Sequence, residues 1–248
     1  MVILKSPTEI AIMKEAGRIV YDVHQELAKV IAPGVTTAEL DRLAESLIRK
    51  AGGIPTFKGY SGFPASICAS INEVVVHGIP DSRQLRDGDV IAIDLGVTYK
   101  GYVGDSAVTH PVGKISPEAQ QLLDVTRVSL EKAIERCYAG NRLGDLGYAV
   151  QSYVESHGFS VVRDYVGHGV GTSMHEEPQI PNWGRPGTGI QLRSGMVLAI
   201  EPMVNVGTWE VRALPDKWTV VTTDGKYSAH FEHTVAITDH GPVILTTA

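Results

Sequence analysis

The chain has 248 residues, of which 43% are hydrophobic, and a formal net charge of −6 from 22 basic and 28 acidic side chains. This hydrophobic content excludes a disordered chain, and the negative charge argues against a dedicated nucleic-acid-binding protein. There is no apolar run of the roughly 20 residues that a membrane span needs, and no signal peptide is recognisable. The two cysteines, Cys68 and Cys137, lack the spacing of a zinc site. We therefore expect one cytoplasmic domain over residues 1–248 that binds neither nucleic acid nor a membrane.

Two helices are predicted at the start of the chain. Residues 6–9, Ser-Pro-Thr-Glu, combine a serine N-cap with a proline at the first helical position and a glutamate at the third. A helical apolar stripe follows until residues 33–34, Pro-Gly. Thr36 and Glu39 form a second capping box, which begins a helix expected to end near Gly52.

The same order of elements restarts in the second part of the chain. Residues 116–117, Ser-Pro, begin a helix that we expect to reach Gly140, and another predicted helix runs from about Leu143 to Gly158. Each helix pair is followed by an apolar stretch rich in β-branched residues, which predicts strands.

The two parts also match residue by residue. Residues 85–97 and 192–204 share Leu, Arg, Gly, Val, Ala, Ile and Val in register, at a shift of 107. Chance similarity of amphipathic segments is the alternative, but amphipathicity does not demand the shared Leu-Arg-x-Gly. We therefore predict two related halves, about residues 1–110 and 111–248.

An acidic pair is predicted on a hairpin in the first half. Residues 100–101, Lys-Gly, suit a two-residue turn whose register pairs Gly96 with Asp105. Side-chain alternation then puts Asp94 on the same face, as the diagonal neighbour of Asp105. Gly96 is expected to leave an open space opposite Asp105. Two carboxylates among apolar residues need solvent, a shared proton or cations.

Three further segments place polar groups in apolar surroundings. The glycines on both sides of His168 leave room for close approach of another group, and the proline after Glu201 holds that acid extended at a strand end. Glu232 lies in a strand-like run, residues 228–238. Each of these could be an ordinary turn or strand residue by itself. The repeat, however, superimposes Asp94 on Glu201, and equivalent strands of the two halves can meet at the centre of a pseudo-symmetric sheet.

Together these residues are typical of a two-metal site. Four acids and one imidazole make up the candidate ligand set: Asp94, Asp105, His168, Glu201 and Glu232. Four negative charges are balanced by two divalent cations, and oxygen-rich ligation with one imidazole suits Co, Mn, Fe(II) or Zn. Two-metal sites activate a water molecule for hydrolysis.

The ordered set of motifs resembles the methionine aminopeptidases, type I most closely, over essentially the whole chain. The matching segments are Asp94 and Asp105 at a spacing of eleven, residues 71–80 with His77, residues 165–171 with His175, residues 180–183, Glu201-Pro202 and Glu232. The resemblance implies the pita-bread metallopeptidase fold. This is an α/β (α+β) architecture of duplicated halves related by a pseudo-two-fold axis, with a central antiparallel β-sheet covered by two pairs of helices.

The resemblance also implies roles for these residues. One metal would be held by Asp105, His168, Glu201 and Glu232, and the other by Asp94, Asp105 and Glu232. His175 would stabilise the tetrahedral intermediate, His77 would contact the region of the scissile bond, and Glu201 would transfer the proton. The reaction would remove the initiator methionine from nascent proteins with a small second residue. Such enzymes are commonly monomers, and contact with the ribosome is compatible with this role.

A methionine pocket follows from the same resemblance. Its lining would consist of Phe57, Tyr60, Phe63, Cys68, His77, Met174 and Trp218. Aromatic walls favour a thioether through burial and sulfur–aromatic contacts, but plain core packing is the alternative for these side chains. Two positions depart from the usual family pattern, because Gly96 replaces a hydroxyl residue and Met174 replaces an aromatic one found in some relatives.

Two rival interpretations remain. Xaa-Pro aminopeptidases and prolidases share the five ligands but usually carry a large N-terminal domain, whereas the first predicted helix begins near residue 6 here. A non-catalytic binding protein on the same scaffold would typically have lost ligands, and all five are present. There is no helical insertion between Glu201 and Glu232, and no zinc-binding N-terminal extension is seen. Both features favour a minimal enzyme of the bacterial type.

Overall fold

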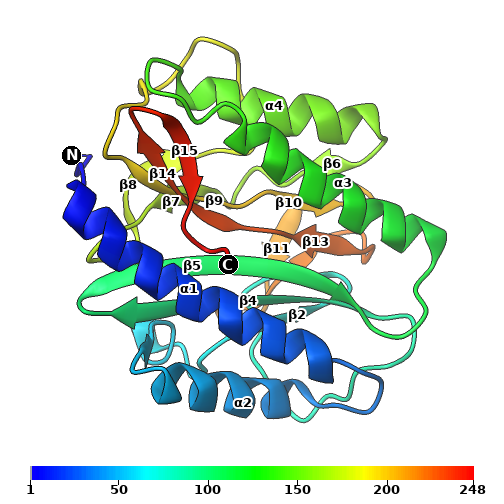
Figure 1. The fold of residues 1–248 in the computed structure, drawn as a ribbon. Helices are drawn as coiled ribbons and strands as arrows, with labels where there is room; N and C mark the ends of the chain where they lie inside the picture. The colour runs from blue at the N-terminus through cyan, green and yellow to red at the C-terminus, as the bar shows by residue number, and fades with distance from the viewer. Residues whose placement is uncertain (1) are drawn as a thin grey trace.

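The computed structural model describes residues 2–248 (Figure 1). In chain order the helices are α1 (Pro7–Val30), α2 (Thr37–Lys50), η1 (Tyr60–Gly62, a 3₁₀ turn), α3 (Pro117–Ile134) and α4 (Leu143–Ser156). The strands are β1 (Ile54–Pro55), β2 (Cys68–Ile71), β3 (Val74–Val76), β4 (Val90–Tyr99), β5 (Tyr102–Pro111), β6 (Ser160–Val161), β7 (Gly167–Gly169), β8 (Glu176–Ile180), β9 (Val197–Ile200), β10 (Met203–Asn205), β11 (Val211–Ala213), β12 (Val220–Thr222), β13 (Ser228–His230), β14 (His233–Thr238) and β15 (Gly241–Ile244).

The helices begin where the capping signals predict. The Ser6 and Thr36 side chains accept hydrogen bonds from the backbone N–H groups of Glu9 and Glu39, whose carboxylates bond back to the cap residues. The prediction that α3 reaches Gly140 is wrong, because this helix ends at Ile134. Beyond that point the backbone bonds shorten to the i→i−3 type, and an apolar stripe does not distinguish such turns from a continuing helix.

All strand pairs are antiparallel, and within residues 2–248 they form four sheets. The first half contains β1-β4-β2 with β5 paired to β4, and the second contains β15-β14-β9-β7-β8. Two three-stranded sheets, β13-β10-β6 and β11-β12-β3, complete the set. The predicted antiparallel β-structure between two pairs of helices is confirmed, and the described strands divide it into these four hydrogen-bonded sheets.

The predicted β4–β5 hairpin is confirmed in register. Tyr99 pairs with Tyr102 and Gly96 with Asp105. Lys100 and Gly101 form the turn with positive φ values of 49° and 83°, the backbone that a tight hairpin turn requires.

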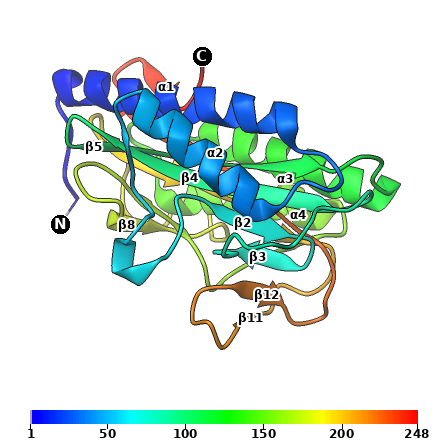
Figure 2. The same ribbon diagram turned by 90° about the horizontal axis from the view of Figure 1, so that it is seen from below.

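Each helix pair packs on a large core cluster, and two smaller clusters combine residues from both parts of the chain. In Figure 1, α1 and α2 cover the strands of the first half, and α3 and α4 cover those of the second. Seen from below in Figure 2, α1 and α2 lie on one side of the strands, while β11 and β12 project from the opposite side. Helix α1 lies very close to β5, since a Cβ at Gly104 would be only 2.7 Å from the backbone nitrogen of Gly17.

The two halves are joined where β5 meets the segment that leads into β14. The hydroxyl of Thr234 accepts a bond from Asp105 N (3.0 Å) and donates one to Asp105 O (2.8 Å). Ser106 Oγ donates to Glu232 O (2.6 Å), and the backbone N–H of Glu232 donates to Ala107 O (2.9 Å). This junction brings acids from distant parts of the chain into one place.

Candidate active site

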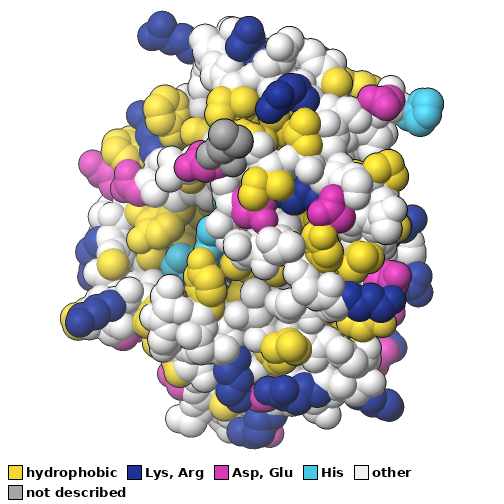
Figure 3. Space-filling model, turned by 90° about the vertical axis from the view of Figure 1, so that its left-hand side faces the viewer, with side chains coloured by type: hydrophobic (Ala, Val, Ile, Leu, Met, Phe, Trp, Pro, Cys, Tyr) yellow, Lys and Arg dark blue, Asp and Glu magenta, His cyan; other side chains and the backbone are white. Residues whose placement is uncertain are grey.

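All thirteen residues predicted for the metal, catalytic and pocket roles line one cavity of about 140 Å³. They are Phe57, Tyr60, Phe63, Cys68, His77, Asp94, Asp105, His168, Met174, His175, Glu201, Trp218 and Glu232. On the face shown in Figure 3, histidine side chains lie among hydrophobic ones to the left of the centre.

The acids come from strands of both halves. Asp94 and Asp105 lie on the β4–β5 hairpin, Glu201 follows β9 immediately, and Glu232 lies directly before β14. His168 is the central residue of β7, and its flanking glycines permit close packing of neighbouring strands. A Cβ at Gly169 would be 2.3 Å from the carbonyl oxygen of Glu177, so a side chain there would force β7 and β8 apart.

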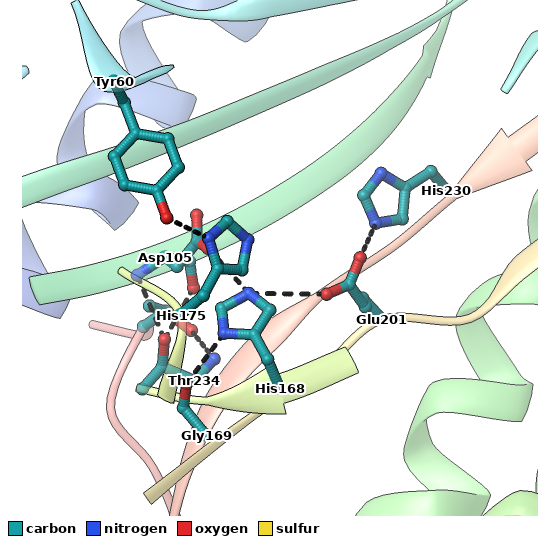
Figure 4. Close-up of polar contacts among 9 residues, drawn as sticks. Tyr60, Asp105, His168, Gly169, His175, Glu201, His230 and Thr234 are labelled. Carbon is teal, nitrogen blue, oxygen red and sulfur yellow. Dashed lines mark hydrogen bonds and ion pairs between the residues drawn. The ribbon is translucent and has the colours of Figure 1, made fainter. Parts of the chain in front are cut away.

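Three of the candidate ligands form a tight group. Asp105, His168 and Glu232 each offer one ligand atom, and these atoms all lie within 4.8 Å of one another. His168 Nε2 is 3.7 Å from Asp105 Oδ2 and 3.6 Å from Glu201 Oε1 (Figure 4). Asp94 lines the same cavity but lies outside the tight group.

The tautomer of His168 follows from its other nitrogen. His168 Nδ1 lies 2.9 Å from the carbonyl oxygen of Gly169, which can only accept, so Nδ1 carries the hydrogen. Burial lowers the pKa of His168 to about 4, and the imidazole is therefore neutral at pH 7. The unprotonated Nε2 then points its lone pair at Asp105 and Glu201, an arrangement that suits a metal ion between them.

The electrostatics of the acids also indicate cations. Burial, followed by the charge of Asp105, raises the pKa of Asp94 well above its usual range. Burial also raises the pKa values of Asp105 and Glu232 strongly and that of Glu201 to about 8. Among the described residues, Asp94 Oδ1, Asp105 Oδ1 and Glu232 Oε1 are buried without a hydrogen-bond partner. Hard cations would satisfy these oxygens, so the donor set fits divalent metals.

Two further histidines border the cavity. His175 Nδ1 lies 2.7 Å from the Tyr60 hydroxyl, and its ring centroid is 4.4 Å from that of His168 (Figure 4). His77 has a positive φ of 60°, which is uncommon for a non-glycine residue. Burial lowers the pKa of His77 to about 4 and also lowers that of His175, so both rings are neutral at pH 7.

The predicted pocket side chains belong both to the cavity wall and to the hydrophobic core. Phe57, Phe63, Cys68 and Met174 belong to one buried core cluster and also line the cavity. Trp218 packs edge-to-face on Phe63, with ring centroids 5.1 Å apart and an interplanar angle of 73°. The same side chains therefore form a wall of the cavity and part of the core.

The expected open space opposite Asp105 is absent. A Cβ at Gly96 would be 2.9 Å from Phe57 Cε1, because the ring of Phe57 lies against this part of β4. The hairpin register alone could not reveal this contact, since Phe57 comes from an irregular segment about forty residues earlier.

Sequence reasoning missed His230. This side chain is 2% exposed, and its Nε2 is 3.5 Å from Glu201 Oε2 (Figure 4). A signal was available, since His230 is two residues before Glu232 and alternation places such residues on one face. A histidine that faces a candidate ligand can orient its carboxylate.

Both ends of the chain are attached beside the cavity. The Lys5 ammonium, buried near the start, pairs with the carboxylate of Glu176, the residue after His175. Near the other end, the hydroxyl of Thr246 bonds to His233 Nδ1 (2.8 Å), the residue after Glu232.

No helix among the described residues is long and apolar enough to cross a membrane.

The chain is similar to known metallopeptidases. The model of metallopeptidase family M24 matches residues 11–239. Methionine aminopeptidase 1 of Bacillus subtilis is 58% identical over 246 residues, which cover 99% of each chain. A crystal structure of a methionine aminopeptidase from Thermotoga maritima has a TM-score of 0.98 at 49% identity and covers 100% of both chains. A prolidase from Pyrococcus horikoshii, at 23% identity and a TM-score of 0.79, shares the fold, and this chain covers 64% of it.

These matches confirm the pita-bread fold and the resemblance to methionine aminopeptidases, and the chain belongs to metallopeptidase family M24.

Proposed function

We propose that this chain is a metal-dependent aminopeptidase that holds two divalent cations and removes N-terminal methionine from nascent proteins. The observation that carries the proposal is the group of buried, uncompensated acids beside the neutral His168, at a cavity with aromatic and sulfur-containing walls. The high identity to methionine aminopeptidases over the full chain supports the same activity.

The chain offers two overlapping ligand sets. One cation would be held by Asp105, His168, Glu201 and Glu232, and the other by Asp94, Asp105 and Glu232. Such cations supply Lewis-acid chemistry, because they acidify water and polarise a carbonyl group. The cations suited to this set are Co, Mn, Fe(II) and Zn.

The protein's own residues position the peptide and move the protons. When the Tyr60 hydroxyl donates to His175 Nδ1, His175 Nε2 carries a hydrogen that can be donated to the developing oxyanion. Glu201 takes a proton from the attacking water and gives it to the departing amine nitrogen as the C–N bond breaks. His77, which also lines the cavity, contacts the peptide near the scissile bond.

The first side chain of the substrate would enter the cavity and contact the wall formed by the aromatic residues and Met174. A small second residue would be preferred, and the natural substrates would be nascent chains in the cytoplasm, met near the ribosome. We propose a monomer with one catalytic domain over residues 1–248, built from halves of about 1–110 and 111–248.

A peptidase assay after metal titration tests this function. The metal-free protein is loaded with Mn or Co and given Met-Ala-Ser, Leu-Ala-Ser and Ala-Pro-containing peptides side by side. We expect release of methionine only, lost on chelation and restored by metal. Preferred cleavage before proline would indicate an Xaa-Pro peptidase instead. Binding of two metal equivalents without turnover of any peptide would indicate a non-catalytic binding protein.

A further inference from the structure

Gly96 occupies a position where the backbone does not require glycine. It lies inside β4 on the face that carries Asp94, and its φ is not positive. Glycine in the interior of a strand weakens the strand and often marks close approach of another group. The group that approaches here is an aromatic ring.

The ring of Phe57 fills the place of the missing side chain. A Cβ at Gly96 would be 2.9 Å from Phe57 Cε1 and 3.3 Å from both Phe57 Cδ1 and Thr56 Cβ. The backbone N–H of Thr56 donates to Gly96 O at 2.9 Å, which fixes the segment that carries the ring to β4. Phe57 is 8% exposed, and the surface that it leaves free lines the cavity.

We propose that Gly96 is a specificity-determining position, because the absence of its side chain lets the ring of Phe57 settle against β4 and thereby sets the room for the first side chain of the substrate. The inference rests on the proposed function. A methyl group at position 96 would displace the ring. The Thr56–Gly96 hydrogen bond holds the backbone beside β4, so the displaced ring has to move away from β4, and its free surface lines the cavity.

A series of tripeptides Xaa-Ala-Ser tests this inference, with 2-aminobutyrate, norvaline, methionine and ethionine as Xaa. The G96A variant is expected to lower kcat/KM for methionine relative to 2-aminobutyrate about tenfold, mainly through KM, since one methylene in an apolar pocket has an effect of this order. The double variant G96A/F57L, with a smaller side chain at position 57, should restore the ratio.

A matched control separates pocket effects from general overpacking. Gly53 is buried next to the same strand, and a Cβ there would be 2.6 Å from Val97 Cγ1 and 3.2 Å from Ile48 Cγ2, side chains that do not line the cavity. The G53A variant should therefore lose stability without a change in the methionine to 2-aminobutyrate ratio. Metal content and unfolding are measured for every variant.

Several outcomes would overturn the inference. An unchanged methionine to 2-aminobutyrate ratio in G96A, or an equal change of that ratio in G53A, would contradict the inference. Cleavage of Met-Ala-Ser by the wild-type protein would still support the proposed function in either case. If G96A does not fold, F57L alone decides, because it should raise the cleavage of ethionine relative to methionine, and an unchanged ratio there shows that Phe57 does not limit the pocket. A wild-type protein that cleaves none of these peptides would count against the proposed function itself.

Discussion

The hydroxyl of Thr234 offers a direct measure of how the two halves are joined. Thr234 is fully buried, and its Oγ1 serves both the N–H and the C=O of Asp105, at 3.0 and 2.8 Å. Substitution by valine keeps the shape but leaves two buried backbone groups without these partners. Each such group costs about 1–3 kcal/mol, so Thr234→Val should lower the free energy of unfolding by about 2–6 kcal/mol. For a chain of this length that corresponds to a fall in Tm of roughly 10 °C.

Urea denaturation of the metal-free protein measures this effect without interference from lost metal. Thr234→Ser is the matched control, since it keeps the hydroxyl and removes only a methyl group, at a cost of about 1 kcal/mol. If the valine variant unfolds at the same urea concentration as the serine variant, the reciprocal hydrogen bonds do not hold the halves together and the reasoning is refuted.

Three further outcomes are expected. Asp105→Asn should reduce bound metal, measured by elemental analysis after dialysis, and lower kcat/KM at least a hundredfold, whereas retention of two metal equivalents would contradict its bridging role. Tyr60→Phe should lower kcat several-fold with little change in Tm, because it removes the 2.7 Å bond to His175 Nδ1, and an unchanged kcat would exclude that contribution. Burial lowers the pKa of His24 in the folded protein to about 3, whereas the unfolded chain has the ordinary value of 6.5. Between these two pH values the unfolded state binds a proton that the folded state does not, so the free energy of unfolding decreases as the pH falls from 6.5 toward 3. Wild type should therefore lose about 2 kcal/mol more than His24→Gln between pH 7 and pH 5, as measured by urea denaturation, and equal losses would be inconsistent with that pKa.

Much of the fold could be predicted from short stretches of sequence. The two capping boxes placed the starts of α1 and α2, because their partners are only three residues apart in sequence. The dipeptide Lys100-Gly101 was sufficient for the hairpin register, because a two-residue turn leaves one way to pair the strands that it connects. With that register known, alternation put Asp94 and Asp105 on one face. The local surroundings of His168, Glu201 and Glu232 added the other candidate ligands. The resemblance to a family supplied His77, His175 and the pocket side chains.

The errors arose where distant segments meet. Nothing near Gly96 in sequence indicates that Phe57 covers it, since the contact depends on an irregular segment whose path is set by tertiary packing. His230 was overlooked although it lies two residues before Glu232, because its partner is Glu201, about thirty residues earlier in the chain, and only the tertiary structure shows that contact. How the described strands group into four sheets was not predicted either, because that grouping depends on how the halves dock and single-strand patterns contain no information on it.

The contacts of Lys5 and Thr246 connect segments near the two ends of the described chain to residues beside the candidate active site. One holds the residue after His175, and the other holds the residue after Glu232. Loss of either contact would free a residue that directly follows a candidate catalytic histidine or a candidate metal ligand.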